Sequence, residues 1–191
     1  MAASVWLAAC SSNSTGPAPG VARSTLLVLP MTAAGTAATP LDQVFMFRNK
    51  ALAQFEVIFS DSVHTVFADL TFPPHSVPFN GDTTLADTST ITVTVAVTPG
   101  SFEFTIGPPT LGFNSAGGPT IALRYGAFGD LSVFSQSARY ASAADYSQAL
   151  ELWFEKTTDH WVEGRNSSHT GASIVSSGLD APGHYFLAAP K

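Results

Sequence analysis

The sequence has little charge and a single cysteine. Charged residues make up 12% of the 191 residues, and the eight lysines and arginines are scattered singly along an acidic chain of net charge −6. We therefore predict no basic surface for nucleic acid or for an anionic membrane. Cys10 is the one cysteine, which excludes an intramolecular disulfide. No apolar run approaches the roughly 18 residues that a membrane-spanning helix needs.

The sequence also lacks the spacings that mark common catalytic and metal sites. Its five histidines never occur as HxH, HxxxH or HExxH, so no zinc site is predicted. Asp159, His160 and Ser167 have no G-x-S-x-G nucleophile motif beside them, so a catalytic triad is not supported either. We therefore expect a protein that is not an enzyme, with no catalytic residues and no cofactor.

The composition favours strands and turns. Hydrophobic residues make up 45% of the chain, and threonine, serine, valine and phenylalanine are common while lysine and glutamate are scarce. The strongest strand pattern is TSTITVTVAVT, residues 88–98, which places Ile91, Val93, Val95 and Val97 on one face. Its β-branched residues fit a pleated sheet and crowd a helix.

A second strand pattern continues on both sides of a long loop. Residues 102–106 and 120–125 alternate apolar and polar side chains, and the Gly- and Pro-rich residues 107–119 join them. The apolar Leu111 and Phe113 in this loop predict that it packs back onto the sheet.

The remaining patterns complete an all-β, antiparallel β-sandwich of about ten short strands over residues 25–191. Residues 43–48 and 54–60 are expected to form a hairpin, and one helical turn near 143–146 precedes a strand over 148–155 that forms a hairpin with 160–165. Other strands are predicted at 25–29, 63–72, 173–177 and 184–188.

The N-terminal residues LAAC, 7–10, followed by SSNSTGPAPG, resemble the lipobox of bacterial lipoproteins. The resemblance implies cleavage before Cys10, a lipid on its sulfur and a place at the cell envelope, at the outer membrane or cell surface. Residues 1–10 are then a partial signal, and residues 11–24 a flexible tether. Without the lipid, the protein is expected to be secreted.

The strand series from about residue 63 to 191 resembles the ZU-five (zonula-occludens/Unc-five) domain, a β-sandwich. The resemblance rests on LTFPPHSV (70–77), TSTITVTV (88–95), FTIGPPTLGF (104–113), GGPTIALRY (117–125), HWVEG (160–164) and HYFLAA (184–189). Some animal members of that family cleave themselves at a His-Phe-Ser triplet. Residues 181–183 read Ala-Pro-Gly at that place, so self-cleavage is not implied.

The hairpin around residues 151–163 carries two tryptophans, Trp153 and Trp161, which we take as the candidate binding surface. Trp153 shares a face with Glu151 and Glu155, so its ring is either exposed as a sticky patch or covered as part of the core.

Together these patterns predict an exported, lipid-anchored, non-catalytic protein that binds or assembles at the bacterial cell envelope. Its expected partner, beyond the membrane, is an envelope protein or a glycan. Two alternatives stay open: a hydrolase acting on carbohydrate through carboxylates near Trp153 and Trp161 (Glu151, Glu155 and Glu163), and a purely structural spacer.

Overall fold

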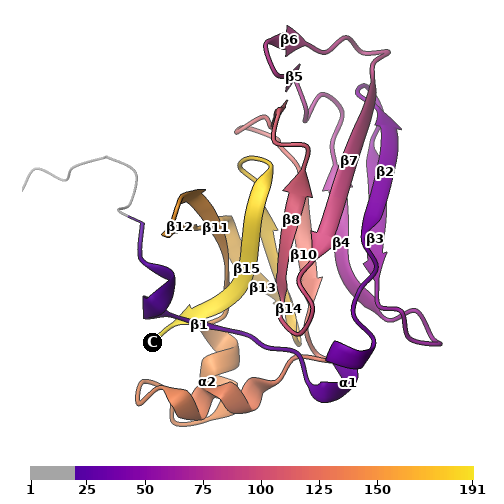
Figure 1. Cartoon of the computed structure of the whole chain (residues 1–191). Coiled ribbons are helices and arrows are strands. Elements are labelled where there is room, and N and C mark those ends of the chain that lie inside the picture. Colours follow the sequence, from indigo (N-terminus) through magenta and orange to yellow (C-terminus); the bar gives the residue numbers. More distant parts are fainter. Residues whose placement is uncertain (1–19) are drawn as a thin grey trace, which may run out of the picture.

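Alternating apolar residues place two antiparallel sheets face to face in the computed structural model, which describes residues 20–191 (Figure 1). The seven-stranded sheet has the order β12 (His160–Glu163), β11 (Glu151–Thr157), β15 (Gly183–Pro190), β8 (Glu103–Gly107), β7 (Thr90–Val97) and β2 (Gln43–Arg48), and β1 (Leu26–Val28) also pairs with β15. The five-stranded sheet has the order β13 (Arg165–Gly171), β14 (Ile174–Gly178), β10 (Thr120–Arg124), β4 (Val66–Phe72) and β3 (Ala53–Ile58). The predicted all-β sandwich is therefore confirmed.

Residues 20–191 contain more strands than the sequence predicts. A small third sheet joins β6 (Thr83–Thr84), β5 (Phe79–Asn80) and β9 (Leu111–Gly112), which are each too short to give a period-two pattern. The sequence analysis also missed β13, because RNSSHTG is polar at every position except its final glycine and reads as a loop.

The core lies between the two large sheets and is rich in aromatic rings. Phe67 of β4 stacks on Phe102, with ring centroids 5.4 Å apart, and Phe104 of β8 stacks on Tyr185 of β15 at 5.5 Å. Along β7, exposed and buried residues alternate without exception, as predicted. The inward valines of β7 are buried, and its outward threonines are exposed.

The expected hairpin between residues 43–48 and 54–60 is wrong. Both strands form, but β2 pairs with β7 in one sheet while β3 pairs with β4 in the other. The connection therefore crosses from sheet to sheet. The phenylalanines of the two strands meet inside the sandwich, where Phe45 stacks on Phe55 with ring centroids 4.5 Å apart. Both side chains are half-buried and pack against the core from opposite sheets, while each strand keeps a pairing partner in its own sheet.

The predicted helical turn and the packed loop are both present. Helix α2 (Ala143–Gln148) begins at Ser142, whose hydroxyl accepts a hydrogen bond from the amide of Asp145. In the loop at residues 107–119, Leu111 is buried, and Phe113 packs against Phe72. The other helical segments are η1 (Arg23–Thr25), α1 (Ala33–Ala37) and η2 (Leu131–Gln136). Within the part of the chain that the structure describes, no helix is both long and apolar enough to cross a membrane.

Replacing Val93 with aspartate should prevent stable folding. Val93 is fully buried on β7, which has neighbours on both sides, so the carboxylate would be an unpaired charge in the core. We expect a loss of several kcal/mol in the free energy of unfolding, measured by urea titration. Thr92→Asp is the matched control, because Thr92 is exposed on the same strand and should change stability by about 0.5 kcal/mol or less. Similar midpoints for the two variants would contradict the assigned face.

Candidate binding site

A groove crosses the outer face of the five-stranded sheet, and its floor consists of short polar side chains. The strand register aligns Thr71, Thr120 and Gly178 in one row across three strands. The next row aligns Asp69, Ala122 and Ser176. Neighbouring strands lie about 4.8 Å apart, so these rows place the hydroxyls of Thr71, Thr120 and Ser176 on one face of the sheet, beside the small Ala122 and Gly178.

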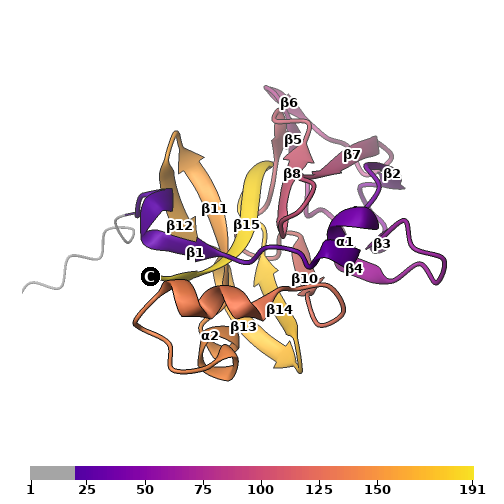
Figure 2. The same ribbon diagram turned by 60° about the horizontal axis from the view of Figure 1, so that its bottom comes forward.

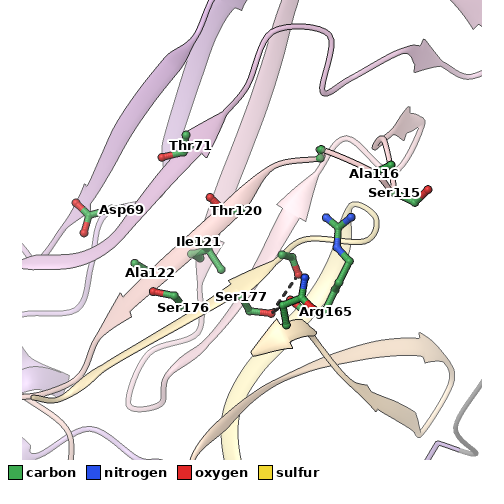
Figure 3. Close-up of a pocket in the computed structure, with 14 residues that line it drawn as sticks. Asp69, Thr71, Ser115, Ala116, Thr120, Ile121, Ala122, Arg165, Ser176 and Ser177 are labelled. Carbon is green, nitrogen blue, oxygen red and sulfur yellow. Dashed lines mark hydrogen bonds between the residues drawn. The ribbon is translucent and has the colours of Figure 1, made fainter. Parts of the chain in front are cut away.

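One end of the groove is closed by a turn and by an arginine. The turn at residues 114–118 is held by a hydrogen bond from the Asn114 amide to the Ser76 carbonyl and by one from the Ala116 amide to Oδ1 of Asn114. Arg165, at the start of β13, lies beneath this turn, and Figure 3 shows its guanidinium pointing toward Ser115 and Ala116.

The groove is large enough for a small organic ligand. Its volume is about 550 Å³, and ligand sites generally lie between roughly 300 and 1,000 Å³. Asp69 lies at the opposite end from Arg165 (Figure 3). We call this feature, from Asp69 across Thr120 and Ser176 to Arg165, the polar groove.

The charges in the polar groove have partners outside its floor. Asp69 Oδ2 lies 2.7 Å from Nε of Arg124, and Arg165 Nε lies 3.4 Å from Oδ1 of Asp180. The floor between these two pairs is neutral. Such a floor offers hydrogen bonds to the polar groups of a ligand.

The predicted binding residues Trp153 and Trp161 lie on the other sheet and are covered. Their exposed fractions are 8% and 2%. They form a second apolar cluster with Leu26, Phe186 and Ala188 on the outer face of the seven-stranded sheet. The segment at residues 20–28 lies over this cluster, beside β12, β11 and β15 (Figure 2). Neither ring presents an open face to a ligand.

This N-terminal segment is bound from its first described residues. The Gly20 amide donates to Nε2 of His160, and Val21 forms a β-bridge with Trp161. The Arg23 amide donates to the Asp159 carboxylate. Residues 20–24, the end of the expected tether, therefore lie on the sandwich. Cys10 lies outside the described residues.

A buried carboxylate fastens this segment to the sheet. Both oxygens of Glu103, a residue only 7% exposed, accept hydrogen bonds from the Arg23 guanidinium, at 3.0 and 2.7 Å. Nε2 of His184 lies 2.6 Å from the same carboxylate, and its Nδ1 lies 3.2 Å from Glu155. The Arg23 guanidinium also lies over Trp161 and Phe186.

The contacts within this cluster favour the charged forms of its members. Burial acts to raise the pKa of Glu103, but the hydrogen bonds from His184 and Arg23 outweigh it and lower the pKa to about 2. The hydrogen bond to Glu103 raises the pKa of His184, against the opposing effect of burial. These contacts therefore favour an ionised Glu103 between the Arg23 guanidinium and a protonated His184.

The carboxylates considered for a hydrolase are arranged around the covered tryptophans. Glu155 is occupied by His184 and by the Asp159 amide. Burial and the neighbouring Glu151 carboxylate raise the pKa of Glu163. Within residues 20–191, no three His, Cys, Asp or Glu side chains are grouped so that they could hold a metal ion.

Sequence reasoning identified the outward residues of β10 but not the polar groove. The alternating pattern of residues 120–125 predicts Thr120 and Ala122 on the solvent-facing side of their strand, where they lie. Their partners Asp69 and Arg165 are distant in sequence, and an outward polar residue in each strand is the ordinary pattern of a solvated sheet face. No signal in the sequence distinguishes this face from a merely exposed one.

Raising the pH should loosen the N-terminal segment. Because the pKa of His184 is raised by folding, the stabilisation from its charge is complete below its ordinary pKa and is lost as the pH rises through the raised value. The stabilisation of the folded state by the ionised Glu103 carboxylate is lost only as the pH falls toward its pKa of about 2. As the pH rises through the raised pKa of His184, the wild type should lose more unfolding free energy than His184→Gln. Parallel pH profiles for the two proteins, measured by urea titration, would contradict this assignment.

The sandwich and its polar groove have no counterpart among the proteins compared with this chain. No protein-family model, no curated protein and no solved structure matches it. The resemblances to the ZU-five domain and to the lipobox therefore remain predictions from the sequence.

Proposed function

We propose that this protein is a non-catalytic binding module of the bacterial cell envelope whose ligand lies in the polar groove. The observation that carries the proposal is the groove itself, with its neutral floor of hydroxyl side chains between Asp69 and Arg165. Serine and threonine hydroxyls both donate and accept hydrogen bonds. They therefore suit a ligand that is itself rich in hydroxyl groups.

Among the expected partners, a glycan fits the polar groove better than a protein surface does. The centres of protein interfaces are enriched in aromatic residues, whereas none of the described residues that line the groove is aromatic. The apolar parts of the lining are small, as with Ala116 and Ala122. A saccharide can exchange its hydrogen bonds with water for bonds to the floor without requiring a large apolar contact.

The place at the envelope rests on the N-terminal sequence. We propose that Cys10 carries the lipid anchor and that residues 11–19 link it to the sandwich. The linked end, Gly20, lies against His160 of the seven-stranded sheet. The polar groove is on the other sheet, so an anchor attached there leaves the groove open to a ligand.

Filling the polar groove should abolish ligand binding without unfolding the protein. Thr120 is exposed in the middle of the floor, and Thr120→Trp would occupy the space above it. On an array of neutral and acidic oligosaccharides, we expect wild-type binding to fall by about tenfold or more. Thr92→Trp is the control, because Thr92 is an exposed threonine of the opposite sheet. Wild-type binding that survives Thr120→Trp would place the ligand elsewhere.

Acylation of Cys10 can be tested separately in a bacterial host. A fatty-acid analogue fed to cells should label the wild type and leave Cys10→Ser unlabelled. The wild type should also partition into detergent, because a buried acyl chain contributes about 0.8 kcal/mol per CH₂ group. Equal labelling of the two proteins would refute the anchor.

A further inference from the structure

Among residues 20–191, Arg165 is the one cation that lines the polar groove, and two contacts restrain its side chain. Its side chain is only 24% exposed. Nε lies 3.4 Å from the Asp180 carboxylate, and Nη2 donates to the carbonyl of Leu179 at 3.5 Å. These two contacts orient the plane of the guanidinium at the end of the groove.

Gly178 makes room for this guanidinium, because a Cβ there would lie 2.6 Å from Nε of Arg165. At Gly118 an added Cβ would first meet the carbonyl oxygen of Asn114 and would also lie 3.1 Å from Nη2 of Arg165. Any other residue at Gly178 would displace the arginine from its slot, since real Cβ atoms do not approach other atoms so closely. The two glycines come from β14 and from the turn above it, so the slot exists only in the folded sandwich.

The guanidinium keeps unused hydrogen-bond donors. An arginine has five N–H groups in a planar fork. In Arg165, Nη2 donates to the Leu179 carbonyl, while the Asp180 carboxylate forms an ion pair beside Nε. Within residues 20–191, Nη1 of Arg165 has no hydrogen-bond partner. A planar fork with parallel N–H groups matches the two oxygens of a carboxylate.

The other charge in the polar groove does not compete for this arginine. Asp69 is at the far end and is paired with Arg124 at 2.7 Å. The side chains between them, such as Thr71, Thr120 and Ser176, carry no charge. A ligand that spans the floor therefore meets uncharged side chains along its length and, at this end, the guanidinium of the Arg165–Asp180 ion pair.

We propose that the polar groove binds an acidic oligosaccharide and that Arg165 pairs with the carboxylate of a uronic acid residue in it. This inference rests on the proposed binding function and specifies its ligand class. The hydroxyl rows hydrogen-bond the sugar rings, while the guanidinium selects the acidic sugar over its neutral counterpart. The protein carries a net charge of −6, so it repels a long anionic polymer more than a short anionic ligand. Salt screens this repulsion for charges more than about 8 Å apart.

An acidic peptide is the competing occupant, and the groove suits it less. Peptides that bind sheets usually add a strand at an edge, with pockets for alternate side chains. The polar groove instead crosses the face of its sheet, over β4, β10 and β14. Its lining has no large apolar pocket that could accept a peptide side chain.

The test is calorimetric titration of the full chain with matched saccharides. The probes are trimers of galacturonate, glucuronate and mannuronate, each beside its uncharged methyl ester, and an Asp-Asp-Asp tripeptide. At least one uronate trimer should bind about ten- to a hundredfold more tightly than its methyl ester. The ester lacks the charged hydrogen bonds between the carboxylate and Arg165. Arg165→Gln should remove that preference, and Arg165→Lys should restore it only in part, because lysine lacks the fork.

Arg139→Gln is the matched control, since it removes the same charge from an exposed position outside the polar groove. It should leave the preference unchanged, and melting temperatures of all variants show whether each one folds. If a uronate and its ester bind equally well and Thr120→Trp abolishes the binding of both, the carboxylate assignment is wrong. The proposed binding function would then still stand. Tighter binding of the tripeptide would overturn the saccharide assignment. Failure of every probe to bind would overturn both proposals.

Discussion

Burial of an aromatic layer between two sheets is the constraint on which the rest of this structure depends. Fully burying one phenylalanine side chain contributes about 1.5 to 3 kcal/mol, and the inward faces of both sheets supply many such rings. This layer explains why β2 and β3 separate into different sheets despite a short connection. A hairpin in one sheet would satisfy the backbone equally well, but Phe45 and Phe55 could no longer stack across the interior.

The seven-stranded sheet has apolar residues on both faces near β15, and the second face needs its own cover. The N-terminal segment provides it, packing Leu26 over Trp153 and Phe186. The ion cluster around Glu103 holds that cover in place. A buried carboxylate costs free energy unless it is paired and hydrogen-bonded, and here it is both. The residues first considered as a binding surface are therefore structural.

No segment within residues 20–191 covers the polar groove of the five-stranded sheet in this way. Its outward residues are short and polar, so solvent exposure costs it little. Arg165 is the exception, because its position depends on β13, on the turn above it and on two glycines that allow close approach. An arginine held in this way loses little side-chain entropy when it binds a carboxylate, whereas a mobile surface arginine would lose more. The structure thus gives this face a geometry that a merely solvated sheet face lacks.

The fold class, most of the strands and the inward face of several strands could be predicted from the sequence alone. Period-two burial is a local property, so β7, β10, β11 and the cap of α2 could be predicted from neighbouring residues alone. The pairing of the strands, the segment that covers the tryptophans and the position of Arg165 became known only from the three-dimensional structure. Strand partners such as β10 and β14 are distant along the chain, and their choice follows from burying both sheets at once. The polar groove could not be predicted from the sequence either, because its floor and both its ends come from separate segments that meet only in the folded sandwich.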